Sequence, residues 1–189
     1  MPKPDSAADD RSRLWAPWRI DYVTQLGEHG THGRETRSGC FLCDAFDCRR
    51  EDGSIDEAQA ERDGVLVCDD RGVMLMNRYP YANGHILVAP EPHVPALRDL
   101  TADQRAGIMD LAEQATRMQE AVLGTHGANI GINQGRAAGA GVPGHLHMHV
   151  VPRWHGDVSF MEVVTGTRVI PQALERSYEL LREAVGKRT

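Results

Sequence analysis

The most constraining feature of this chain is a stretch in which three histidines alternate strictly with apolar residues. Residues 145–151 read His-Leu-His-Met-His-Val-Val. Successive side chains of a β-strand point to opposite faces, so a strand here lines one face with imidazoles about 6.5–7 Å apart and buries Leu146, Met148 and Val150 on the other. Three polar rings in a row do not stabilise a packed strand, because each needs a partner to offset its lost hydration. The pattern therefore indicates a role in chemistry.

Three interpretations of this polar face remain open from the residues alone. The histidines can be ordinary side chains that face solvent with their hydrogen bonds satisfied. They can converge on zinc and leave one coordination position open. Alternatively, one neutral imidazole attacks a phosphate group while its neighbours donate hydrogen bonds to the developing negative charge.

The remaining pattern predicts an α+β fold, a meandering antiparallel sheet of about five strands with helices packed on it. Besides the histidine stretch, short apolar runs bounded by turn residues mark strands at 65–68, 73–76, 85–89 and 128–133, and 158–164 is a candidate for one more. Thr101 and Gln104 have the spacing of a capping box, and the apolar stripe that follows ends at Gly124. A last helix is expected from Pro171, with Leu174, Tyr178, Leu181 and Val185 on one face.

Length and composition limit the class of protein. The chain has 189 residues, enough for one domain, expected at 14–189 after a flexible leader at 1–13. The two tryptophans within 14–19 predict an aromatic plug on the surface or at a subunit contact, and the charged segment 47–63 predicts an exposed excursion or short helix. A net charge of −6 argues against a broad nucleic-acid surface. Without a long apolar run or a secretory signal, we expect no membrane contact and a cytoplasmic protein.

Four cysteines offer a possible metal site. Cys40 and Cys43 have the CxxC spacing, which fits zinc, redox chemistry or a chance pairing, and Cys48 is near enough in sequence to replace one ligand. Cys68 lies in an apolar run and is expected in the core.

The histidine stretch and two upstream segments together resemble the histidine triad (HIT) superfamily of nucleotide hydrolases and transferases. Residues 76–90 resemble its ribose-binding strand pair, and 131–135 resemble its phosphate-side strand and loop. Residues 14–19 and 150–154 resemble the branch that includes actinobacterial diadenosine tetraphosphate phosphorylases. The resemblance implies a HIT-like domain, a homodimer, and a nucleoside polyphosphate substrate.

The resemblance also implies a role for each site residue. His147 would attack the α-phosphorus, with its Nδ1–H held by a backbone carbonyl near His145, and His149 would donate to a phosphate oxygen. His85 would lie behind the catalytic ring, Asn77 would bind ribose, and Asn133 would contact phosphate or the leaving group. From the residues alone, the two asparagines can simply close turns, and His85 can be an ordinary buried histidine.

One departure from the family concerns the loop before the triad. Many members carry Gly-Gln-Ser or Gly-Gln-Thr there, whereas residues 140–144 read Ala-Gly-Val-Pro-Gly. Backbone N–H groups around Gly141 can bind phosphate instead, and Arg136 or Arg153 can add positive charge. The departure leaves the handling of the leaving group, and hence the preferred substrate, open.

In some relatives a CxxC pair is completed by two histidines, and the matching positions are His93 and His145. The resemblance therefore implies a structural zinc site of Cys40, Cys43, His93 and His145, with no cofactor required for the chemistry. Zinc at His145 would stiffen the strand that presents His147.

The implied reaction is a double displacement through a nucleotidyl-histidine. With phosphate as acceptor the protein is a diadenosine tetraphosphate phosphorylase, the interpretation we favour, and with water it is a hydrolase. The alternative from another class is a nucleotide-binding regulatory protein whose turnover is incidental.

Overall fold

The structure is a computed structural model that describes residues 38–157 and 172–186. The expectations for the leader at 1–13, the aromatic segment 14–19 and a strand at 158–164 lie outside the described residues.

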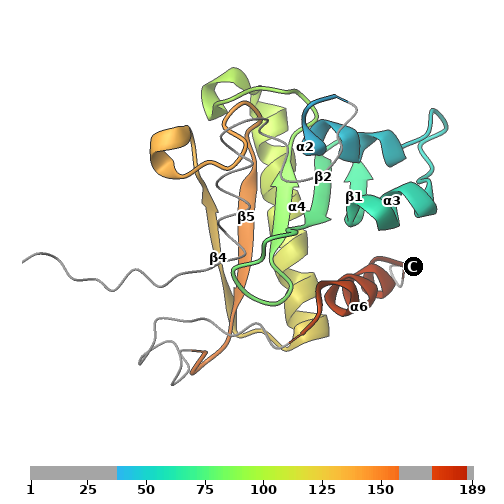
Figure 1. The fold of residues 1–189 in the computed structure, drawn as a ribbon, viewed down its shortest axis with the longest axis vertical. Helices are drawn as coiled ribbons and strands as arrows, with labels where there is room; N and C mark the ends of the chain where they lie inside the picture. Colours follow the sequence, from blue (N-terminus) through green and yellow to red (C-terminus); the bar gives the residue numbers. More distant parts are fainter. Residues whose placement is uncertain (1–37, 158–171, 187–189) are drawn as a thin grey trace, which may run out of the picture.

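The core of the fold is a five-stranded antiparallel sheet, as the sequence predicts (Figure 1). Its strands are β1 (Val65–Asp69), β2 (Gly72–Met76), β3 (Ile86–Ala89), β4 (Gly127–Ile132) and β5 (Met148–Arg153). Their spatial order is β1-β2-β3-β5-β4, so only the first three strands form a meander. After β3, the long helix carries the chain to the far edge of the sheet, where β4 forms. The chain then returns, and β5 occupies the position between β3 and β4. The histidine strand is therefore an inner strand with a partner on each side.

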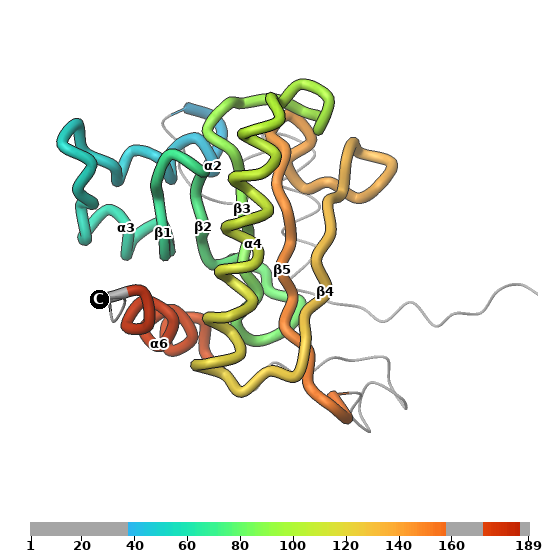
Figure 2. Tube along the Cα trace, turned by 180° about the vertical axis from the view of Figure 1, so that it is seen from behind, coloured from blue at the N-terminus to red at the C-terminus, as the bar shows by residue number. Residues whose placement is uncertain are grey.

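Helix α4 (Ala102–Leu123) covers one face of the sheet (Figure 2). Both hydrogen bonds of the predicted capping box are present between Thr101 and Gln104, and Gly124 ends the helix in the left-handed conformation. The predicted stripe faces the sheet, where it packs into one core cluster with the apolar side of the histidine stretch. This cluster includes Ile108, Leu111, Ala115, Met118, Leu146, Met148 and Val150.

On the opposite face of the sheet, the segment that carries the CxxC pair covers strands β1 to β3. It contains α2 (Phe41–Asp44), the 3₁₀ helix η1 (Ala45–Cys48) and α3 (Glu57–Asp63). Its buried side chains pack on Val73 and Leu75 of β2 and on Leu87 of β3. Because this face is covered as well, every residue of β2 is buried. His149 pairs with Leu87 across the sheet and so lies on this second face.

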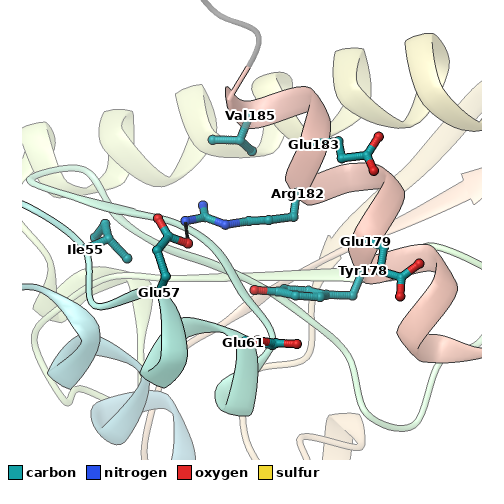
Figure 3. Close-up of a pocket in the computed structure, with 8 residues that line it drawn as sticks. All are labelled: Ile55, Glu57, Glu61, Tyr178, Glu179, Arg182, Glu183 and Val185. Atoms are coloured by element: carbon teal, nitrogen blue, oxygen red, sulfur yellow. Dashed lines mark hydrogen bonds and ion pairs between the residues drawn. The ribbon is translucent and has the colours of Figure 1, made fainter.

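Helix α6 (Leu174–Gly186) packs against α4 and covers the edge strand β1. Tyr178 donates its hydroxyl hydrogen to the carbonyl of Val65 at 3.3 Å, and Arg182 Nη1 donates to that of Leu66 at 2.6 Å. Arg182 also reaches across to pair with Glu57 on α3 (Figure 3). Helices on an exposed edge prevent unwanted strand pairing. Among the described residues, no helix combines the length and apolar character needed to cross a bilayer.

Two further 3₁₀ helices lie in the connections, η2 (Leu97–Asp99) before α4 and η3 (Arg136–Ala138) between β4 and β5.

Candidate active site and metal centre

The histidine stretch departs from a regular strand at its first three residues. β5 begins at Met148 rather than at His145, where the sequence predicted a strand. Its ladders to β3 and β4 both end at Met148. On the β3 side the chain continues into Pro90, which has no N–H to extend the ladder. Leu146 instead donates its N–H to the carbonyl of Val94 at 2.7 Å.

Because of this early end, the three imidazoles do not form one regular row. His145 turns toward the cysteines, whereas the rings of His147 and His149 lie edge to face with centroids 5.1 Å apart. The metal-site and phosphate-chemistry interpretations thus apply to different members of the same stretch.

His147 is oriented by the backbone of its own chain. Its Nδ1 lies 2.9 Å from the carbonyl oxygen of His145, so Nδ1 carries the hydrogen and donates it. The side chain is 4% exposed, and this burial lowers the pKa of the imidazole. A neutral ring with hydrogen on Nδ1 leaves the lone pair on Nε2, which is the form that a nucleophile requires.

His149 is oriented by a relay that starts at a backbone N–H. Tyr81 donates its N–H to Nδ1 of His85 at 3.1 Å, so that nitrogen is an acceptor. The neutral His85 ring then carries its hydrogen on Nε2, 3.1 Å from Nδ1 of His149. His149 accepts there and carries its own hydrogen on Nε2. The relay therefore leaves His149 with one N–H available as a donor.

Burial keeps these rings neutral. It lowers the pKa of His85 to about 3, with further contributions from the charges that His149 and His147 would carry. Burial, followed by the same effect from His147, lowers the pKa of His149 to about 4. All three rings are therefore uncharged near neutral pH, and each has a defined tautomer.

The structure corrects the expected place of His85. Its hydrogen bond goes to His149, so it lies behind the donor ring rather than behind His147. Asn77 closes the turn, as its alternative interpretation held, by accepting the N–H of Tyr79 at 3.0 Å. Its Nδ2 also lies 3.1 Å from Nδ1 of His85, which keeps it beside the histidines.

The two remaining substrate-binding predictions, Asn133 and Gly141, lie in the connection between β4 and β5. Asn133 follows β4, and its side-chain amide lies beside His149, with Nδ2 3.5 Å from Nε2 of that ring. Both nitrogens are donors, so this approach is not a hydrogen bond. Gly141 is buried in the loop that leads into His145. Its contact with a phosphate stays a prediction.

Sequence reasoning missed Tyr81. Its ring lies 5.7 Å from that of His149 at an interplanar angle of 23°, and 4.7 Å from that of His85. It is 36% exposed, so this aromatic ring lies at the surface beside both histidines. An aromatic residue in the turn before Gly84 and His85 was the only available signal.

The four predicted metal ligands come together from three parts of the chain. The potential ligand atoms of Cys40, Cys43, His93 and His145 all lie within 4.8 Å of one another. Cys40 precedes α2 and Cys43 lies within it, so one helical turn brings both thiols to the same point.

Spacing and donor chemistry both fit a tetrahedral zinc ion. Cys43 Sγ is 3.1 Å from His93 Nδ1 and 3.4 Å from His145 Nδ1, and Cys40 Sγ is 3.5 Å from His145 Nδ1. Bond lengths near 2.0–2.3 Å imply ligand separations of about 3.3–3.8 Å. His145 donates from Nε2 to the carbonyl of Pro90 at 2.9 Å, which directs the lone pair of Nδ1 to the thiols.

The other two cysteines lie apart from this group. Cys48 is fully buried and donates its S–H to the carbonyl of Ala45 at 3.1 Å, so it does not replace a ligand. Cys68 is 6% exposed and packs in the core, as the apolar run predicted.

A hollow of about 690 Å³ between α3 and α6 is a poor site for a polyphosphate (Figure 3). Four glutamates line it, whereas its one arginine, Arg182, is paired with Glu57. Like charges repel, so this surface disfavours an anionic substrate.

Comparisons with known proteins agree with this geometry. The HIT domain family model matches residues 59–156. The AP-4-A phosphorylase of Mycobacterium tuberculosis is 35% identical over 174 residues, which cover 92% of this chain and 84% of the relative. The asymmetrical bis(5'-nucleosyl)-tetraphosphatase of Schizosaccharomyces pombe is 36% identical over 89 residues, 47% of this chain and 48% of that protein. A crystal structure of a Zn-bound histidine triad family protein from Mycobacterium smegmatis matches with a TM-score of 0.55 at 33% identity, covering 65% of this chain and 84% of that one.

Proposed function

The chain belongs to the HIT domain family, and we propose that it cleaves dinucleoside polyphosphates through a nucleotidyl-histidine formed on His147. The observation that carries this proposal is the bond from Nδ1 of His147 to the carbonyl oxygen of His145, which leaves the lone pair of the neutral ring on Nε2. The names of the phosphorylase and tetraphosphatase relatives support the substrate class.

In the first step, Nε2 of His147 attacks the α-phosphorus and a P–N bond forms as the bond from phosphorus to the bridging oxygen breaks. The polyphosphate product leaves with that electron pair. The His147 ring becomes positively charged, and the carbonyl oxygen of His145 stabilises it through the Nδ1–H. His149 donates its Nε2–H to an oxygen of the phosphate, where negative charge increases.

In the second step, an acceptor oxygen attacks the same phosphorus, the P–N bond breaks, and His147 recovers its lone pair. We favour phosphate as the acceptor, because the phosphorylase relative matches over most of this chain. Diadenosine tetraphosphate would then yield ATP and ADP. Water as acceptor would give ATP and AMP, and the tetraphosphatase relative, matched over a shorter length, favours this second candidate.

The product assay separates these functions. Purified protein is incubated with diadenosine tetraphosphate with and without inorganic phosphate, and the nucleotides are separated by ion-exchange chromatography. ATP and ADP formed only with phosphate support the phosphorylase, whereas ATP and AMP in both reactions support the hydrolase. Tight binding without products would instead support the regulatory alternative.

We further propose a structural role for zinc held by Cys40, Cys43, His93 and His145. A bound ion would supply a rigid link between the α2 segment and the chain that presents His147. The Zn-bound relative supports the identity of the metal. The chemistry of His147 and His149 needs no cofactor.

The protein is proposed to act as a homodimer in the cytoplasm, without nucleic-acid or membrane partners. Ile130 on the edge strand β4 is 45% exposed, and Met109 on α4 is 54% exposed, so both a strand and a helix offer apolar surface to a second copy. Light scattering after size-exclusion chromatography tests the dimer, and a mass equal to one chain argues against it.

A further inference from the structure

Gln119 is a fully buried polar residue in the apolar face of α4. Its exposed fraction is 0%, although it is surrounded along the helix by the core residues Ala115 and Met118. Its Oε1 is the one buried side-chain oxygen or nitrogen without a hydrogen-bond partner in the described part of the chain. An unpaired buried acceptor is unfavourable, and glutamine is uncommon at fully buried positions. Packing alone therefore does not account for this residue.

The amide nitrogen of Gln119 joins two segments of the active site. Its Nε2 donates to the carbonyl of Gly84 at 2.9 Å and to the carbonyl of Val150 at 3.1 Å, which uses both of its hydrogens. Gly84 directly precedes His85, and Val150 directly follows His149. One side chain thus connects the backbones that carry the two relay histidines.

This connection lies where the strand ladder ends. The pairing of β3 with β5 runs from Val88 and Met148 to Ile86 and Val150 and stops there. His85 lies beyond the last pair, so no ladder bond fixes its distance from β5. Gln119 bridges the two segments of the chain at this point. It belongs to α4, the helix that covers this face of the sheet (Figure 2).

A close approach of α4 makes the bridge possible. Leu123 lies one helical turn after Gln119, and a Cβ at Gly84 would collide with its side chain. Gly84 also has a φ of 70°, in the left-handed region that favours glycine. The absent side chain lets the helix contact the loop, which brings Gln119 within reach of the carbonyl.

We propose that Gln119 is a positioning residue, which holds His85 and His149 at the separation of their Nε2–Nδ1 hydrogen bond. It acts through the backbone and touches no substrate. Its effect on turnover rests on the proposed function, whereas its effect on the two imidazoles does not.

The test compares Gln119→Met with Gln114→Met. Methionine has similar volume and no donor, and Gln114 is a second buried glutamine of the same helix, bonded to Arg71 rather than to the site loops. Histidine side-chain nitrogen NMR of the substrate-free proteins reports the tautomer of each ring. Should Gln119→Met not fold, Gln119→Asn takes its place, since it withdraws the amide by one methylene.

The expected result is that Gln119→Met loses the single tautomers of His85 and His149, while Gln114→Met keeps them. The kcat of Gln119→Met falls on the order of tenfold with little change in KM, as expected when catalytic groups are slightly displaced. Unchanged imidazole signals in the folded variant, or equal changes in both variants, overturn the proposal whatever the activity. A wild-type protein without turnover would contradict the proposed function. The NMR comparison would still decide whether Gln119 positions the two histidines.

Discussion

Acid should destabilise this protein through a histidine that is buried in its neutral form. His85 has an exposed fraction of 0%, and burial lowers its pKa to about 3, against about 6.5 in an unfolded chain. Because the folded pKa is the lower one, the unfolded state binds the proton first. The contribution of the neutral His85 to the free energy of unfolding is complete above about pH 6.5 and is lost as the pH falls toward 3.

The magnitude follows from the two pKa values. Between pH 7 and pH 5, protonation of the unfolded chain at His85 alone lowers the free energy of unfolding by about 2 kcal/mol. His85→Gln removes the titrating ring, so its stability should depend less on pH by this amount. His126→Gln, which makes the same substitution at an exposed histidine, provides the matched control.

Urea unfolding followed by circular dichroism at pH 7 and pH 5 measures the difference. The metal site is the same in all three proteins, so acid release of a metal cancels in the comparison. If wild type and His85→Gln lose equal stability between the two pH values, the reasoning that burial keeps His85 neutral is refuted.

Three further changes test the metal site, the turn and the helix cap. Cys40→Ser should lose bound zinc because one thiolate ligand is removed, and metal analysis with unchanged stoichiometry would contradict the site. Gly84→Ala should lower the free energy of unfolding by at least about 1–2 kcal/mol, because a φ of 70° is unfavourable for alanine and the new Cβ would collide with Leu123. An unchanged melting temperature would argue against this. Thr101→Ala should cost about 1 kcal/mol in urea unfolding without affecting the kcat, because it removes the acceptor for the N–H of Gln104.

Local pattern was sufficient to predict the five strands and helices α4 and α6, but not the short helix α2 or the 3₁₀ helices. The alternation at 145–151 correctly placed Leu146, Met148 and Val150 in the core, and the capping box located the start of α4. The four cysteine and histidine positions of the metal cluster, up to 105 residues apart, were gathered correctly only because of the family resemblance. The CxxC spacing alone fits zinc, redox chemistry and a chance pairing.

Contacts between distant segments could not be predicted in the same way. The position of β5 inside the sheet depends on where β4 forms after α4. The start of β5 at Met148 depends on where its pairing with β3 and β4 ends. His85 bonds to His149 because β3 and β5 are neighbours in the sheet, and His85 lies two residues before Leu87, the partner of His149. The role of Gln119 could not be predicted for a related reason, because the position of a glutamine in a helix does not show which distant carbonyl groups its amide will contact.

A trapped intermediate tests the central claim most directly. Protein mixed with diadenosine tetraphosphate is quenched in alkali during turnover, where a phosphoramidate survives, and its peptides are analysed by mass spectrometry. We expect an adenylyl group on the peptide that contains His147, and neither the adduct nor the products in His147→Gly. Turnover that continues in His147→Gly, or an active wild type that never yields the adduct on His147, would contradict the mechanism.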